Sequence, residues 1–137
     1  MSRKSELYQP VAGPPRSLVD KLGVKPEAKV VVLGVRDASF REQLAQRTGD
    51  VRARPVKNAA LIFLGAESTR DLKKLASLGR FLRRDGGIWV VAPRGSKDVT
   101  TVAVIAAGRA AGLTDVKVVR FSETHTSLKF VIPVARR

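Results

Sequence analysis

The sequence contains no cysteine, a single histidine and few aromatic residues. Without cysteine, the chain can form neither a disulfide framework nor a thiolate zinc site, and it has no thiol nucleophile. A single histidine also excludes a metal site built from several imidazoles, so we predict no metal. With one Trp, one Tyr and five Phe, most of them within apolar runs, little aromatic surface remains for stacking on nucleic-acid bases.

Acidic residues are scarce relative to basic ones. Lys and Arg number 26 against 12 Asp and Glu, which gives a formal net charge of +14 and favours anionic partners. No apolar run approaches the roughly 20 residues that cross a bilayer. The start of the chain, MSRKSE, has no apolar segment like that of a signal peptide. We therefore expect a cytoplasmic protein with no membrane partner.

At 137 residues, of which 44% are hydrophobic, the chain is long enough for one domain with a core. Residues 1–16 contain Pro10, Gly13, Pro14 and Pro15 with few apolar side chains, which predicts a mobile basic arm. Residues 17–137 are predicted to form a single α/β domain. Deleting the arm should leave thermal stability nearly unchanged.

Short apolar runs predict the strands. Runs at 30–33, 60–64 and 88–91 are typical of strands buried on both faces of a parallel sheet, and 51–56 is expected to be a weak edge strand. Residues 116–121 and 128–134, joined by a polar turn at 123–127, predict a terminal hairpin.

Capping patterns and helical spacing predict the helices. We expect helices over 17–22, from a capping box at 39–42 to Gly49, over 69–84 with Gly86 and Gly87 ending it, and over 98–111. The last of these is apolar nearly all round, so it is expected to be covered on several sides. The predicted fold is Rossmann-like: a doubly wound, mostly parallel sheet with a C-terminal antiparallel hairpin.

Residues 17–134 resemble the class I S-adenosylmethionine-dependent methyltransferase fold. The resemblance is carried by LGVKP at 22–26 leading into VVVLG at 30–34, by the Gly86-Gly87 turn within 82–89, and by AGLTDV at 111–116. More closely, the chain resembles an uncharacterised bacterial family of small domains of unknown function with a truncated, methyltransferase-like form of this fold. There Glu123-Thr124 and LKFV at 128–131 match, and the family has an aromatic residue where this chain has His125.

Methyltransferases of this fold usually carry several glycines after the first strand and an acidic residue at the end of the second, which holds the ribose hydroxyls. Here residues 34–39 contain one glycine, and 55–58 contain no carboxylate. The stretch 51–61 also lacks the helix that normally follows the second strand. The resemblance therefore implies weak or no binding of S-adenosylmethionine. Any cofactor contact is expected at Gly34, Asp37, Gly65 and Glu67.

In open parallel sheets, ligands bind beyond the carboxyl ends of the strands, near the point where the strand order reverses. The loops at that edge carry polar and charged side chains that are candidates for one shallow cleft: Asp37, Glu67, Arg94, Lys97, Glu123 and His125. Alternatively, these residues are helix caps and solvated side chains.

The stretch Arg94-Gly95-Ser96-Lys97 is an anion-site candidate. A glycine permits close backbone approach, the following helix would offer unpaired N–H groups, and two cationic side chains favour phosphate. The glycine spacing does not match a P-loop. An ordinary loop with a helix cap is the alternative interpretation.

Basic residues recur at helical spacing over 69–84, opposed only by Asp71: Arg70, Lys73, Lys74, Arg80 and Arg84. With the arm, they are a candidate track for RNA or DNA backbone, with low sequence specificity. A solvated helix face is the alternative.

Three functions remain open. The first is a degenerate, non-catalytic methyltransferase-like module that binds an anionic partner, either nucleic acid or a nucleotide. The second is an active S-adenosylmethionine-dependent enzyme with a minimised pocket, in which Asp37 or Glu67 replaces the ribose acid. The third is a protein-interaction domain. No catalytic residue and no oligomeric state is assigned.

Overall fold

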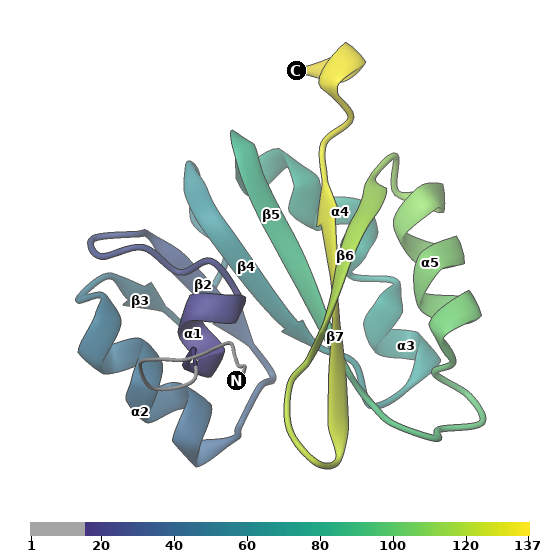
Figure 1. Ribbon diagram of the computed structural model, residues 1–137. Coiled ribbons are helices and arrows are strands. Elements are labelled where there is room, and N and C mark those ends of the chain that lie inside the picture. Colours follow the sequence, from purple (N-terminus) through teal and green to yellow (C-terminus); the bar gives the residue numbers. More distant parts are fainter. Residues whose placement is uncertain (1–15) are drawn as a thin grey trace, which may run out of the picture.

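Six strands form one sheet in the order β3-β2-β4-β5-β7-β6 (Figure 1). Strands β2 (Val30–Leu33), β3 (Val51–Arg52), β4 (Ala59–Gly65) and β5 (Leu82–Pro93) run parallel. Strand β7 (His125–Val131) runs antiparallel to both β5 and β6 (Thr114–Arg120). The mostly parallel sheet with a C-terminal antiparallel hairpin is thus confirmed.

The computed structural model describes residues 16–137. The predicted mobile arm therefore lies outside the described residues, except for Arg16, whose guanidinium donates to the backbone oxygen of Asp20. Among the described helices, none is long and apolar enough to cross a membrane.

Helices cover both faces of the sheet (Figure 1). Helices α1 (Leu18–Lys21) and α2 (Ala38–Arg47) lie on one face, and α3 (Thr69–Leu72), α4 (Leu75–Leu78) and α5 (Thr101–Ala110) lie on the other. The hairpin of β6 and β7 has no helix in front of it in this view. Short 3-10 turns, η1 (Gly79–Phe81) and η2 (Val134–Arg136), complete the chain.

Each face of the sheet has its own hydrophobic core, because successive strand side chains point to opposite faces. Ile62, Ile88 and Phe130 belong to the core beneath α3, α4 and α5. Phe63 and Trp89 belong to the core beneath α1 and α2. The indole Nε1 of Trp89 donates a hydrogen bond to the backbone oxygen of Leu22, 3.1 Å away, which ties α1 to the sheet.

The predicted helix over 69–84 is wrong in its continuity and in its last three residues, 82–84. The chain forms α3, a tight turn, α4 and η1, and it then enters β5 at Leu82, which lies opposite Ala59 of β4. Gly86 and Gly87 lie inside β5 and end no helix. A Cβ at Gly86 would be 2.8 Å from the backbone oxygen of Ala60, so glycine is needed there for close strand approach. Strand pairing with a distant segment thus overrides helical periodicity.

Three further boundaries differ from the prediction. Asp37, rather than Ser39, caps α2, because its carboxylate accepts the N–H of Phe40 at 2.8 Å. Helix α5 begins at Thr101 rather than residue 98, and it is a surface helix: Val102 is 77% exposed. Residues 125–127, predicted as turn, pair with β5 and belong to β7.

Candidate functional site

The strand order reverses between β2 and β4, since β3 continues the sheet on one side and β5 on the other. A cleft of about 540 Å³ lies at this point, at the carboxyl ends of the parallel strands. We call it the switch-point cleft. Its lining residues come from the loops after β2 and β4, from α3 and from the hairpin: Gly34, Val35, Arg36, Asp37, Gly65, Glu67, Asp71, Lys74, Val91, Phe121, Thr124 and His125.

Two glycines form the floor of the cleft where β2 and β4 end. Gly34 has a φ of +76°, a conformation that glycine adopts without strain. A Cβ on Gly65 would overlap the carbonyl oxygen of Gly34, so the two backbones approach more closely than any side chain would permit. The loops are therefore held against each other at the base of the cleft.

The carboxylates of the cleft are engaged in local hydrogen bonds. Asp37 caps α2, and Asp71 accepts the backbone N–H groups of Glu67 at 3.0 Å and Ser68 at 3.3 Å. Burial raises the pKa of Asp71, but these N–H groups and Lys74 together hold it below its ordinary value. The ammonium of Lys74 lies 3.5 Å from the Asp71 carboxylate. Both acids thus contribute to loop structure.

His125 joins the hairpin to the loop after β4. Its Nε2 lies 2.8 Å from Oε2 of Glu67, and its Nδ1 lies 2.8 Å from the hydroxyl oxygen of Thr124. The imidazole is therefore held by partners on both nitrogens. This contact brings together residues that are 58 positions apart in the sequence.

A second hollow, of about 390 Å³, lies between α5 and the sheet, and we call it the α5 hollow. Arg94, Gly95 and Ser96 line it, whereas Lys97 lines neither this hollow nor the switch-point cleft. The Ser96 hydroxyl accepts the N–H groups of Asp98 and Val99, and Thr100 caps α5. Because the helix starts later than predicted, residues 94–97 form a separate turn before it.

The residues predicted to form one cleft at the carboxyl edge of the sheet thus divide between the two hollows. Asp37, Glu67 and His125 lie together in the switch-point cleft, while Arg94 lies in the α5 hollow. Glu123 lines neither, but its backbone oxygen lies 3.5 Å from the guanidinium of Arg94. Sequence reasoning missed Phe121 and Thr124 in the cleft. Phe121 precedes the predicted turn at 123–127 and Thr124 lies within it, and these positions were the available signal.

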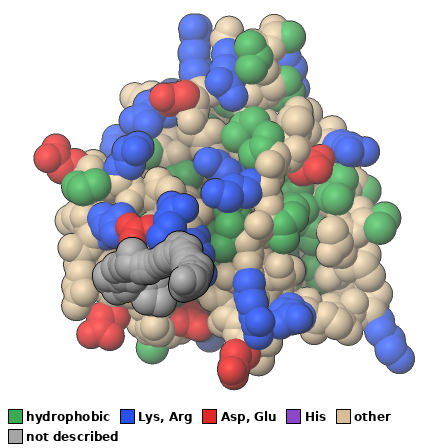
Figure 2. All heavy atoms as spheres, in the orientation of Figure 1, with side chains coloured by type: hydrophobic (Ala, Val, Ile, Leu, Met, Phe, Trp, Pro, Cys, Tyr) green, Lys and Arg blue, Asp and Glu red, His purple; other side chains and the backbone are tan. Residues whose placement is uncertain are grey.

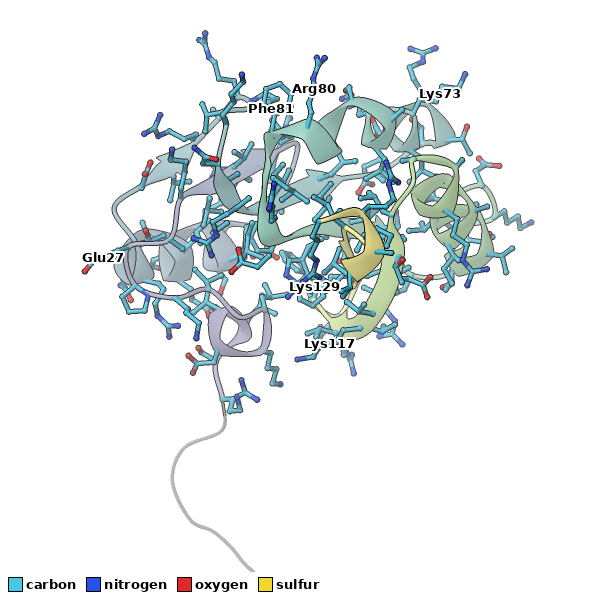
Figure 3. All side chains as sticks on the ribbon, turned by 90° about the horizontal axis from the view of Figure 1, so that it is seen from above. Glu27, Lys73, Arg80, Phe81, Lys117 and Lys129 are labelled. Carbon is cyan, nitrogen blue, oxygen red and sulfur yellow. The ribbon has the colours of Figure 1, made fainter. Side chains whose placement is uncertain are left out.

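Arg70, Lys73 and Arg80 follow the outer side of α3, α4 and η1, which we call the α3–η1 surface. Arg84, predicted on the same helix face, lies in β5 instead, because the chain enters that strand at Leu82. Leu72, Leu75 and Leu78 are buried against the sheet, so the intervening side chains point outward. Figure 3 shows Lys73 and Arg80 projecting away from the ribbon on the same side. Lys74 departs from this surface, since it reaches into the switch-point cleft.

No protein family model matches the chain, and no curated protein is similar to it. Solved structures are similar in fold. The pyocyanin biosynthetic protein PhzM matches with a TM-score of 0.63 and 11% identity over 84% of this chain and 53% of its own. A TehB-like S-adenosylmethionine-dependent methyltransferase from Corynebacterium glutamicum matches with a TM-score of 0.54 and 13% identity over 85% of both chains.

A third similar structure is an S-adenosylmethionine-dependent methyltransferase from Aquifex aeolicus, with a TM-score of 0.57 and 12% identity over 85% of this chain and 88% of its own. The chain thus spans about half of PhzM, at 53%, but most of the smaller enzymes. These similarities show that the chain has a truncated class I methyltransferase-like fold. Residues 53–58, between β3 and β4, contain no helix, as predicted.

Proposed function

We propose that the chain is a nucleic-acid-binding module built on a methyltransferase-like fold, and that it does not transfer methyl groups. The observation that carries the proposal is the set of outward cations on the α3–η1 surface, in a chain with a net charge of +14. Arg70, Lys73 and Arg80 form no salt bridge with any carboxylate among the described residues. Such cations can neutralise phosphates and release the counterions condensed on them.

The side chains on this surface suit backbone contact more than base recognition. The guanidinium carbon of Arg80 lies 5.1 Å from the ring centroid of Phe81, which limits its orientations. Phe81 is the aromatic residue of this surface, and it is half-buried. Binding should therefore be electrostatic and nearly independent of sequence.

The cleft residues do not fit S-adenosylmethionine at its ribose. Strand β3 ends at Arg52, and the hollow beside it, which continues the switch-point cleft, is lined by Ala53, Arg36, Arg41 and Lys74. These cations lie where the resemblance to methyltransferases predicts a carboxylate that accepts hydrogen bonds from two ribose hydroxyls. Asp37 and Glu67, the candidates to replace that acid, are already bonded to Phe40 and His125. We derive no methyl-transfer step.

Nucleic-acid binding is tested by fluorescence anisotropy with a labelled single-stranded RNA at low salt. The variant replaces Arg70, Lys73 and Arg80 with Gln. A control variant removes the same charge elsewhere, by replacing Lys21, Lys97 and Arg120 with Gln. At about 0.1 M salt each lost phosphate contact should weaken binding about fivefold, so the first variant loses about 100-fold and the control loses far less. Equal losses in both variants, or no binding by the wild type, would contradict the proposal.

The cofactor question is tested separately by calorimetry with S-adenosylmethionine. We expect weak or no heat of binding, because the ribose contacts are unmet. A well-defined micromolar isotherm would instead favour the enzyme alternative, which the S-adenosylmethionine-dependent methyltransferases of similar fold support.

A further inference from the structure

Two lysines face each other across the terminal hairpin. Lys117 of β6 is directly opposite Lys129 of β7 in the antiparallel register. Residues paired in this way have their Cβ atoms only about 5 Å apart, and like charges at such a pair are destabilising. The repulsion between Lys117 and Lys129 therefore lowers the stability of the fold.

The surroundings hold Lys129 in place. A Cβ at Gly87 would lie 2.5 Å from Cε of Lys129, so the lysine stem occupies the space above that glycine. Its Nζ lies 5.8 Å from the ring centroid of Trp89. Burial, and then repulsion from Lys117, lowers the pKa of Lys129. The ammonium is therefore half-buried, positioned and incompletely solvated.

No carboxylate among the described residues compensates this charge. Asp115, also in β6, lies 3.5 Å from Arg109 of α5, on the opposite face of the sheet. No salt bridge of the described residues includes Lys117 or Lys129. Figure 1 shows no helix in front of the hairpin, and Figure 2 shows Lys and Arg side chains beside hydrophobic surface on this face.

We propose that Lys117 and Lys129 bind a backbone phosphate of a nucleic-acid strand on this uncovered face of the hairpin. The proposal rests on the nucleic-acid binding proposed above. One phosphate between two ammonium groups replaces their repulsion by attraction to a shared anion. Trp89 is only 1% exposed, so it is not available to stack on a base. Charge complementarity therefore favours the backbone as the ligand.

Cations also connect this face with the α3–η1 surface. The Arg83 side chain, bonded to Asp85, and the charge of Arg137 both lower the pKa of Asp85. Arg137, the residue after η2, therefore lies near Asp85 of β5. Figure 3, seen from above, shows Lys73 and Arg80 on one side of the molecule and Lys117 on the other, with η2 between them. The turn η2, which Arg137 follows, thus lies between the two cationic surfaces.

The test replaces both lysines with methionine, which keeps an unbranched stem above Gly87 and Trp89. The control replaces Arg54 and Lys57 with methionine, the same charge loss at exposed positions after β3, at the opposite edge of the sheet. For single-stranded RNA at about 0.1 M salt, we expect the hairpin variant to bind about fivefold more weakly, with a salt slope smaller by about 0.7, because one phosphate contact is lost. The control should bind like the wild type. In the absence of RNA, the hairpin variant should unfold at higher temperature than the wild type, because the repulsion is gone.

The outcomes are distinguishable. If the hairpin variant binds RNA like the wild type while the α3–η1 variant is weakened, the inference is overturned and the proposed function stands. If the wild type binds no RNA, both are overturned. Inorganic pyrophosphate separates the remaining case: if it binds the wild type through these lysines and RNA does not, the site takes small phosphates and the assignment to a strand is wrong.

Discussion

The packing of α5 on the sheet gives the sharpest prediction about stability. Gly108 is a buried position of α5, and it faces the ring of Phe130, which is 0% exposed. A Cβ at Gly108 would overlap Cε1 of that ring and would lie 2.5 Å from Cδ1 and 2.6 Å from Cζ. Carbon atoms in contact are normally about 3.5–4.0 Å apart. Gly108→Ala therefore forces one methyl group into occupied space.

Two opposing terms set the size of the effect. Alanine in a helix interior is favoured over glycine by about 1 kcal/mol. Overpacking of a well-packed core costs about 1–3 kcal/mol, and more where the neighbour cannot move. Since three atoms of a fully buried ring are overlapped, the second term is larger, and we expect a net loss of about 2 kcal/mol in the free energy of unfolding.

Urea unfolding of the wild type and of Gly108→Ala measures this difference. The matched control is Gly79→Ala, where a Cβ would meet only Leu113 Cδ2 at 3.8 Å and the backbone is already helical, with a φ of −56°. The control should be neutral or slightly stabilising. A Gly108→Ala protein as stable as the wild type would refute the packing of α5 against Phe130.

Two further predictions concern the attachment of α1. Trp89→Phe removes the donor to the Leu22 oxygen and should lower the free energy of unfolding by about 1–2 kcal/mol, measured by urea unfolding; an unchanged midpoint would argue against that hydrogen bond. The hydrogen bond from Arg47 lowers the pKa of Asp20 below its ordinary value of 3.8. The stabilisation that this hydrogen bond gives to the fold is therefore present above pH 3.8, and it is lost as the pH falls through the lowered pKa of Asp20. Melting temperatures should fall more steeply on acidification in the wild type than in Asp20→Asn, and parallel curves would contradict this.

The strands were predictable because their signal is local. Val30, Ile62 and Ile88 are each fully buried, and each lies in a short, continuous apolar run with a glycine at one end. The antiparallel hairpin was likewise signalled by a polar turn between two apolar segments. These elements need no information from elsewhere in the chain.

The segment from 69 to 84 was not predictable in this way. Leucines at helical spacing continue as far as Leu82, and only pairing with Ala59, a distant residue, converts Leu82 into the start of a strand. The residues of the switch-point cleft, by contrast, were partly predictable. Because the loops after parallel strands meet at one edge of the sheet, Asp37, Glu67 and His125 were expected to lie close together, and they line one cleft.

Side-chain direction was harder to predict than position. Lys74 has the spacing of an outward helix residue, yet it lines the switch-point cleft, where its ammonium lies 3.5 Å from the Asp71 carboxylate. The pairing of Lys117 with Lys129 depends on an irregularity between Asp115 and Lys117, which shifts the register of β6. A shift of one residue would place Lys117 on the other face.

The salt dependence of RNA binding tests the central claim most directly. The logarithm of the association constant should fall linearly with the logarithm of salt concentration, and each phosphate contact on a single strand contributes about 0.7 to the slope. Replacing Arg70, Lys73 and Arg80 with Gln should reduce the slope by about 2.1, equally for RNAs of different sequence. A wild-type affinity that is independent of salt, or a slope unchanged in this variant, would contradict nucleic-acid binding through the α3–η1 surface.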